Sequence, residues 1–189
     1  VFANYRKPAG TVKQNGTKNY VGWAYPENLP AEKDIIVLDY VPIDAEVDVL
    51  ITGYRSTVPE VGSFWLDDDI KAAVELLTVL GQMDKALIAD AEFKLEKPLL
   101  DEIARVDVSN FAGRKNSRDP HIVLYADDEM PIYWGAAIGK SSRYLEADDS
   151  EKLEKLYGIY KENGTLAGKF KYVELRIPQK NFPRPTIQK

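Results

Sequence analysis

The chain has 189 residues, of which 44% are hydrophobic and 29% charged, and its formal net charge is −5. This balance is typical of one globular domain, and the acidic charge argues against binding to nucleic acid. Because the chain has no cysteine and a single histidine, His121, the composition excludes disulfides, thiolate metal ligands and a site with two histidines.

The N-terminal third is rich in turn signals that separate short strands. Asn15-Gly16 lies between two strand-like segments, 10–13 and 19–23, and an Asn-Gly pair in this position predicts a β-hairpin. Two further short strands are expected, at 35–38 and 47–51.

The clearest helix of the sequence opens at Asp67. Apolar residues recur from Ile70 to Leu80 at the spacing of an amphipathic helix, and Gly81 is expected to end it. The three aspartates 67–69 suit the positive end of a helix dipole. Because consecutive residues point around a helix axis, this run favours a helix start over a cation site.

The second half of the chain alternates strands with helices. A strand at 105–109 is expected to turn Val106 and Val108 inward, because apolar and polar residues alternate there. The other expected elements are a helix or turn within 83–91 or 98–103, a hairpin of 121–126 with 130–135, a helix over 149–163 closed by Gly164, and a strand over 170–177.

This order predicts an α+β domain with a mostly antiparallel β-sheet and two main helices. Hairpins alternate with helices, and the sequence has neither a glycine-rich phosphate loop nor a regular βαβ repeat. The domain is expected to span 1–178, and the proline-rich residues 179–189 are expected to form a tail. The tryptophans Trp23, Trp65 and Trp134 are expected in the core.

The sequence contains no recognisable catalytic constellation. Its acidic residues are expected at turns and helix ends, where water keeps them ionised and unsuited to acid–base work. His121 follows a proline at the start of a strand, which favours an edge position over a catalytic one. Ser141 has no evident base except its neighbour Lys140. We therefore expect a protein that is not an enzyme, with no catalytic residue, metal or cofactor. A hydrolase that uses a pair of carboxylates stays open as an alternative.

The last strand is the best candidate for docking another chain. Alternation places Val173, Leu175 and Ile177 on one face and Tyr172, Glu174 and Arg176 on the other. At a sheet edge, its unpaired N–H and C=O groups could accept a strand from a partner, with Tyr172 and Arg176 adding contacts. An ordinary amphipathic strand with a solvated face explains the pattern equally well.

A series of short motifs follows the chain in a recognisable order. The motifs are Arg6-Lys7-Pro8, Ile51-Thr52-Gly53 before the helix 67–80, Val106-Asp107-Val108-Ser109, the hairpin ending in Trp134-Gly135, Lys152-Leu153-Glu154-Lys155-Leu156, and Tyr172-Val173-Glu174-Leu175-Arg176. Together they resemble the β-domain of the bacterial cell-division family FtsQ/DivIB, and the chain is identified as a divergent member.

The resemblance implies a scaffold domain on the periplasmic or extracytoplasmic face of a bacterial inner membrane. Residues 1–8 would be the junction with an upstream POTRA domain, and an N-terminal membrane helix would precede it. Partners similar to FtsB/FtsL would dock by strand addition at the last strand, beside the helix Lys152–Tyr160. The implied partner-binding residues are Tyr172, Glu174, Arg176, Val173, Leu175, Leu156 and Tyr160.

A second function class stays open from the sequence. The 20 aromatic residues (11 Tyr, 6 Phe and 3 Trp) could instead serve a secreted or periplasmic module that binds polysaccharide or peptidoglycan. Such a module needs aromatic faces that are open to solvent, so burial of the tryptophans would argue against it.

Overall fold

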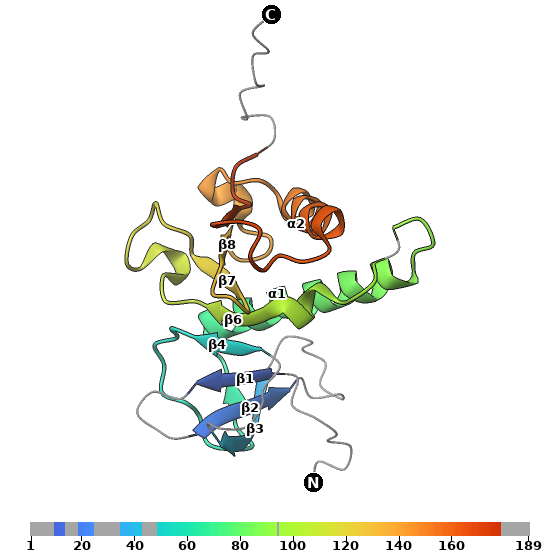
Figure 1. Ribbon diagram of the computed structural model, residues 1–189. Coiled ribbons are helices and arrows are strands. Elements are labelled where there is room, and N and C mark those ends of the chain that lie inside the picture. The colour runs from blue at the N-terminus through green and yellow to red at the C-terminus, as the bar shows by residue number, and fades with distance from the viewer. Residues whose placement is uncertain (1–9, 14–18, 25–34, 43–48, 94, 179–189) are drawn as a thin grey trace, which may run out of the picture.

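The computed structural model describes residues 10–13, 19–24, 35–42, 49–93 and 95–178. The expected tail, the upstream junction and the Asn15-Gly16 turn lie outside these ranges. The elements, with η for a short 3₁₀ helix, are β1 (Gly10–Lys13), β2 (Asn19–Ala24), β3 (Ile35–Pro42), β4 (Leu50–Thr52), β5 (Phe64–Trp65), α1 (Asp68–Ala89), η1 (Leu99–Glu102), β6 (Ile103–Asp107), η2 (Phe111–Gly113), β7 (Ile122–Ala126), β8 (Pro131–Gly135), η3 (Ser141–Tyr144), α2 (Asp149–Asn163) and β9 (Val173–Glu174) (Figure 1).

All the described strands join one nine-stranded sheet in the order β5-β3-β2-β1-β4-β6-β7-β8-β9. The two expected hairpins, β1 with β2 and β7 with β8, are antiparallel. However, β4 runs parallel to both β1 and β6, and β9 runs parallel to β8. The fold is therefore α+β with a mixed sheet, and the expectation of a mostly antiparallel sheet is corrected: α1 and α2 act as crossovers between parallel strands.

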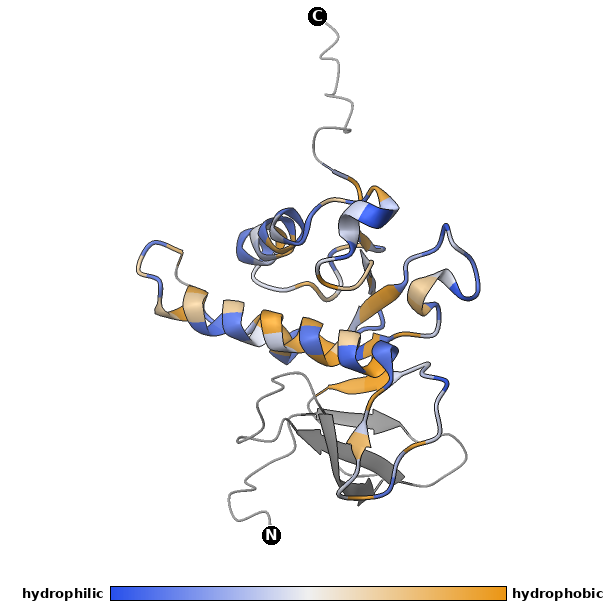
Figure 2. Ribbon diagram, turned by 180° about the vertical axis from the view of Figure 1, so that it is seen from behind, coloured by the Kyte–Doolittle hydropathy of each residue, from blue (hydrophilic) through white to orange (hydrophobic). Residues whose placement is uncertain are grey.

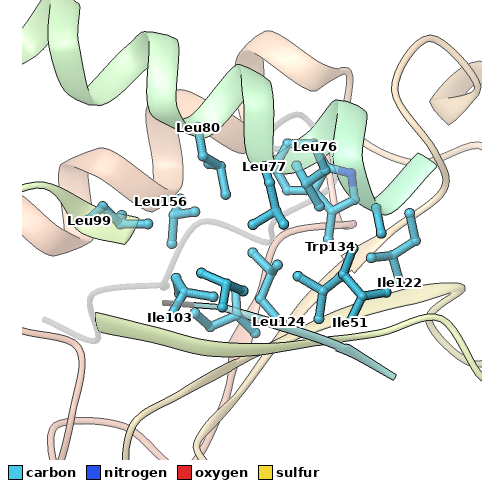
Figure 3. Packing of buried hydrophobic residues seen from close by; sticks show 14 of the residues in the cluster. Ile51, Leu76, Leu77, Leu80, Leu99, Ile103, Ile122, Leu124, Trp134 and Leu156 are labelled. Atoms are coloured by element: carbon cyan, nitrogen blue, oxygen red, sulfur yellow. The ribbon is translucent and has the colours of Figure 1, made fainter. Parts of the chain in front are cut away.

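The core lies between one face of the sheet and the two main helices. In Figure 3, Leu76, Leu77 and Leu80 of α1 and Leu156 of α2 face side chains of the strands. The strand residues that are fully buried or nearly so include Ile51, Trp65, Ile103, Val106, Ile122, Leu124, Ala126, Ile132, Trp134 and Val173. Their alternation with half-buried neighbours is the period-two pattern of a sheet covered on one face.

Helix α1 is longer than the sequence predicted. It passes through Gly81, where we expected it to end, and continues to Ala89. The extra turns carry Asp84, whose Oδ1 accepts hydrogen bonds from the Leu99 N–H at 2.8 Å and the Tyr157 hydroxyl at 2.9 Å. These tertiary contacts outweigh the local stop signal of a glycine. Figure 2 shows apolar and polar residues alternating along this helix.

Helix α2 forms where the sequence placed it, over Asp149–Asn163. The Asp148 carboxylate caps its N-terminus by accepting a hydrogen bond from the Glu151 N–H at 2.8 Å. Gly164 ends it in the left-handed conformation, with a φ of 71°. The strand expected at 105–109 is found as β6, which starts two residues earlier and ends at Asp107, and the inward orientation expected for Val106 and Val108 is confirmed, because both are fully buried.

The last strand is shorter than expected, because β9 covers Val173–Glu174 only. Val173 and Leu175 turn inward as predicted, but Ile177 is 42% exposed and does not share their face. Trp65 and Trp134 are fully buried, as expected, while the side chain of Trp23 lies outside what is described. Among the described helices, none has the length and apolar character needed to cross a membrane.

Candidate functional site

A pocket of about 540 Å³ opens at the carboxyl ends of β8 and β9, the edge of a parallel strand pair where α/β proteins often bind ligands. Its walls come from the loop before β7, from η3 and from the segment after β9. Among the residues that line the pocket are Arg118, His121, Tyr144, Leu145, Arg176 and Ile177.

His121 lies at this pocket and is only 3% exposed. The sequence favoured an edge position, and this was wrong, because β7 lies between β6 and β8 inside the sheet. The imidazole meets the Tyr144 ring edge-on, with 4.3 Å between the ring centroids. Burial lowers the pKa of His121, Glu146 opposes this, and Arg176 and Lys152 add to it. The imidazole is therefore neutral at pH 7.

The lowered pKa of His121 predicts a loss of stability in mild acid. The imidazole of the unfolded chain binds a proton near pH 6.5, whereas that of the folded chain binds it only at a lower pH. Between these two pKa values the unfolded chain holds more protons, so the folded state is most stable above this pH range. As the pH falls through it, the free energy of unfolding should drop by up to about 1.4 kcal/mol per pH unit. Urea unfolding of the wild type and of His121→Gln between pH 7.5 and 5 measures the difference. Equal slopes for both proteins would contradict the prediction.

A buried ion pair stands behind the pocket wall. Lys152 is completely buried, and its Nζ lies 2.7 Å from Oε2 of Glu146. The same Nζ donates to the Ser141 hydroxyl at 3.3 Å and lies 5.3 Å from the centroid of the Trp134 ring. The sequence pattern did contain a signal for Lys152, because it shares the helix face of the core residues Leu156 and Tyr160 at intervals of four.

The pairing of Ser141 with a lysine does not make a nucleophile. The lysine that contacts Ser141 is Lys152, whereas the sequence suggested its neighbour Lys140. A Ser–Lys dyad needs a neutral amine to accept the serine proton. Here Lys152 is held by the Glu146 carboxylate, and the Ser141 hydroxyl donates to Oδ1 of Asp149 at 2.8 Å. With Ser141 only 5% exposed, the cluster is a structural tie between η3 and α2.

Gly135, at the end of β8, leaves the space in which the Glu146 carboxylate sits. Its φ is +91°, and a Cβ at this position would overlap both carboxylate oxygens of Glu146 and lie 2.6 Å from Cγ of Arg176. The Ala136 N–H also donates to Oε2 of Glu146, at 2.9 Å. The Glu146 carboxylate thus joins the residue that follows β8 to α2.

The expected docking residues divide into exposed and buried sets. Tyr172 is 55% exposed and stacks on Tyr133, with 5.5 Å between ring centroids. Glu174 and Arg176 pair with each other through contacts of 3.0 and 2.8 Å. The remaining four are core residues whose side chains face the interior, so a role for them in docking stays a prediction that could act only through the backbone or through support of the strand: Val173, Leu175, Leu156 and Tyr160.

A second ion pair, which the sequence did not predict, joins the start of α1 to the strand ends. Arg114 Nη1 lies 2.8 Å from Oδ2 of Asp69, and its other nitrogens donate to the carbonyls of Ser109 and Gly53 at 3.0 and 2.8 Å. Asp69 is therefore a partner for arginine. Within the described ranges, no group of three or more histidine or acidic side chains is placed to hold a metal ion.

Comparison with known proteins adds no relative to this picture. No protein-family model matches the chain, and neither a curated protein nor a solved structure matches it.

Proposed function

We propose that this chain is a non-enzymatic docking domain that takes up an extended segment of a partner protein along the outer edge of β9. The observation that carries the proposal is the place of β9 at the end of the sheet, next to the exposed Tyr172. An edge strand offers unpaired backbone groups to a further strand, and a neighbouring aromatic side chain adds an anchor.

The proposal agrees with what the resemblance to the FtsQ/DivIB β-domain implies. In that setting the partners are proteins similar to FtsB/FtsL, and the domain stands on the periplasmic or extracytoplasmic side of an inner membrane, held by an upstream helix. The process served would be assembly of the division machinery at the septum.

The hydrogen bonds around β9 limit where a partner strand can lie. The Leu175 N–H donates to the Tyr133 carbonyl at 3.2 Å, so the backbone N–H and C=O of Glu174 point away from β8. The Glu174 carbonyl accepts a hydrogen bond from Lys155 Nζ at 2.5 Å, and the Arg176 carbonyl accepts one from the Ala147 N–H at 2.7 Å.

A partner segment is therefore best accommodated along residues 170–174. Beyond Glu174 the loop before α2 closes the edge, and at Glu174 the partner must replace Lys155 as the donor to the carbonyl. This segment also carries Phe170, which is 37% exposed, so two aromatic side chains flank the docking edge.

Tyr172→Ala is expected to weaken partner capture by about 1–3 kcal/mol, the usual cost of removing an aromatic anchor. The measurement is affinity capture from a detergent extract of the source cell's envelope, followed by identification of the retained proteins. Phe64→Ala is the matched control, because Phe64 is also exposed, at 42%, but lies on β5 at the opposite end of the sheet. Short coiled-coil membrane proteins should be retained by the wild type and the control and lost from Tyr172→Ala. Retention of the same set by all three baits would reject β9 as the docking edge.

Among the described residues, no observation favours the alternative of a glycan-binding module. Trp65 and Trp134 are fully buried and so offer no ring face to a sugar. One face of the exposed Tyr172 ring is already covered by Tyr133.

A further inference from the structure

Leu145, the residue that follows η3, is the most exposed large apolar side chain in the described part of the chain, at 87%. Its backbone is left-handed, with a φ of +56°, a conformation that glycine or asparagine adopts more easily than leucine. The side chain therefore makes little contact with the fold, and the backbone is strained at the same residue. Neither feature stabilises the domain, so the fold itself gives no reason for a leucine here.

The residues on either side hold Leu145 in place. Tyr144 meets the His121 ring edge-on, and the carboxylate of Glu146 is paired with the buried Lys152 at 2.7 Å. In Figure 1, η3 is the short orange helix at the end of the molecule opposite β3. The leucine is thus presented to solvent on a fixed turn at one end of the domain.

Positive charges flank this leucine. Lys140 and Arg143 are both exposed, and neither forms an ion pair within the residues that the structure describes. The Arg143 guanidinium lies 5.8 Å from the centroid of the Tyr144 ring. Residues 140–145, which we call the η3 tip, contain two cations and no acid.

The acidic side chains that follow the η3 tip are engaged within the fold. Glu146 is paired with Lys152, and Asp148 caps the N-terminus of α2. The Asp149 carboxylate accepts hydrogen bonds from the Gly139 N–H at 2.6 Å and from the Ser141 hydroxyl at 2.8 Å. The surface of the tip therefore combines one apolar side chain with two cations that no neighbouring carboxylate holds.

We infer that the η3 tip contacts the surface of a membrane that contains anionic lipid, with Leu145 inserted below the headgroups and Lys140 and Arg143 against them. A bilayer accepts a convex apolar tip, and anionic headgroups attract the basic side chains beside it. A stable protein interface needs about 800 Å² of complementary surface on each side, which one projecting leucine does not supply. The inference does not rest on the docking proposal, which concerns β9.

The negative charge of the whole chain does not oppose this contact. The net charge is −5, but salt screens the field of a membrane within about 10 Å, so the charges of the tip act first. The attraction of two cations and the transfer of one leucine together correspond to half-binding at about 1 mM lipid.

Flotation of the full chain with lipid vesicles measures this binding. Vesicles of phosphatidylcholine with about 30% phosphatidylglycerol should carry the protein, and vesicles of phosphatidylcholine alone should bind it at least about fivefold more weakly. Raising the salt to about 0.5 M should remove most of this difference. The double variant Lys140→Gln/Arg143→Gln should bind both kinds of vesicle equally weakly.

Leu145→Asn should change binding and stability in opposite directions. Its affinity for the anionic vesicles should fall about tenfold, because the apolar side chain is lost. Its urea midpoint should rise, because asparagine tolerates a positive φ better than leucine does. Leu66→Asn is the matched control: Leu66 is 63% exposed but precedes Asp67 and Asp68, so this variant should float as the wild type does.

The absence of cysteine allows insertion to be observed directly. Leu145→Cys, labelled with an environment-sensitive fluorophore, should show a blue shift of its emission with the anionic vesicles. The same label on Leu66→Cys should show none.

Three results would overturn the inference: no flotation with the anionic vesicles, equal flotation of the wild type and Leu145→Asn, or no blue shift of the label at residue 145. A Leu145→Asn variant that floats normally but no longer captures a protein from the envelope extract would assign the tip to a protein partner instead. The docking proposal is tested separately, through Tyr172, so either proposal can fail alone.

Discussion

Replacing Lys152 by methionine is expected to lower the free energy of unfolding by about 3–5 kcal/mol. Methionine keeps the length of the buried stem, so packing against Trp134 changes little. What is lost is the positive charge 2.7 Å from the Glu146 carboxylate, which then stays behind as a largely buried, unpaired charge. Urea unfolding followed by circular dichroism measures the change.

Two further proteins test whether the loss comes from the ion pair. Lys161→Met, on the exposed side of the last turn of α2, removes a contact with the Phe93 ring and a positive charge near Asp90, and should cost less than about 1 kcal/mol because both interactions are open to solvent. The double variant Lys152→Met/Glu146→Gln removes both charges and should recover a large part of the loss. If Lys152→Met loses no more stability than Lys161→Met, the buried pair of Lys152 and Glu146 does not contribute substantially to stability.

The parts of the fold that could be predicted from the sequence are those with local causes. Helix α2 begins with an aspartate cap and ends at Gly164, and both signals lie within one turn of the boundary they set. The β7–β8 hairpin is likewise set by alternation and by the turn between its strands.

The parts that could not be predicted depend on residues far apart in the chain. The end of α1 is decided at Asp84, whose partners Leu99 and Tyr157 lie 15 and 73 residues away. The parallel pairing of β9 with β8 follows from the way α2 packs on the sheet, and no local pattern at 170–177 encodes it.

The candidate site divides in the same way. Tyr172 was recognised from strand alternation and is exposed, as that alternation requires. The pocket was missed, because His121 becomes a pocket residue only when η3 brings the Tyr144 ring against it from a distant part of the chain. Lys152 was missed for a different reason: its position on the apolar face of α2 was visible, but a lysine there is unexpected without knowledge of Glu146.

Gly135→Ala is expected to cost at least about 3 kcal/mol, the other large effect in this fold. An alanine at a φ of +91° is strained by about 1–3 kcal/mol. In addition, its Cβ would displace the Glu146 carboxylate and so separate it from Lys152. The measurement is again the free energy of unfolding in urea.

Two other glycines separate the backbone cost from the displacement of Glu146. Gly164 also has a positive φ, +71°, but no atom lies within 4 Å of a Cβ placed there, so Gly164→Ala should show the conformational cost alone. Gly158 lies inside α2 with open space around it, so Gly158→Ala should stabilise the protein by about 0.5–1 kcal/mol. A cost for Gly135→Ala no larger than that for Gly164→Ala would mean that Glu146 yields without penalty.

The losses of stability expected for Lys152→Met and Gly135→Ala both involve the Glu146 carboxylate, so they should not be additive. If Gly135→Ala acts mainly by removing Glu146 from Lys152, then in the Lys152→Met background that pair is already broken. The second substitution should then cost little more than its backbone strain, close to the value for Gly164→Ala. Additive losses would instead show that Gly135 acts through the crowding of Arg176, whose Cγ is the other atom that a Cβ at this position would meet.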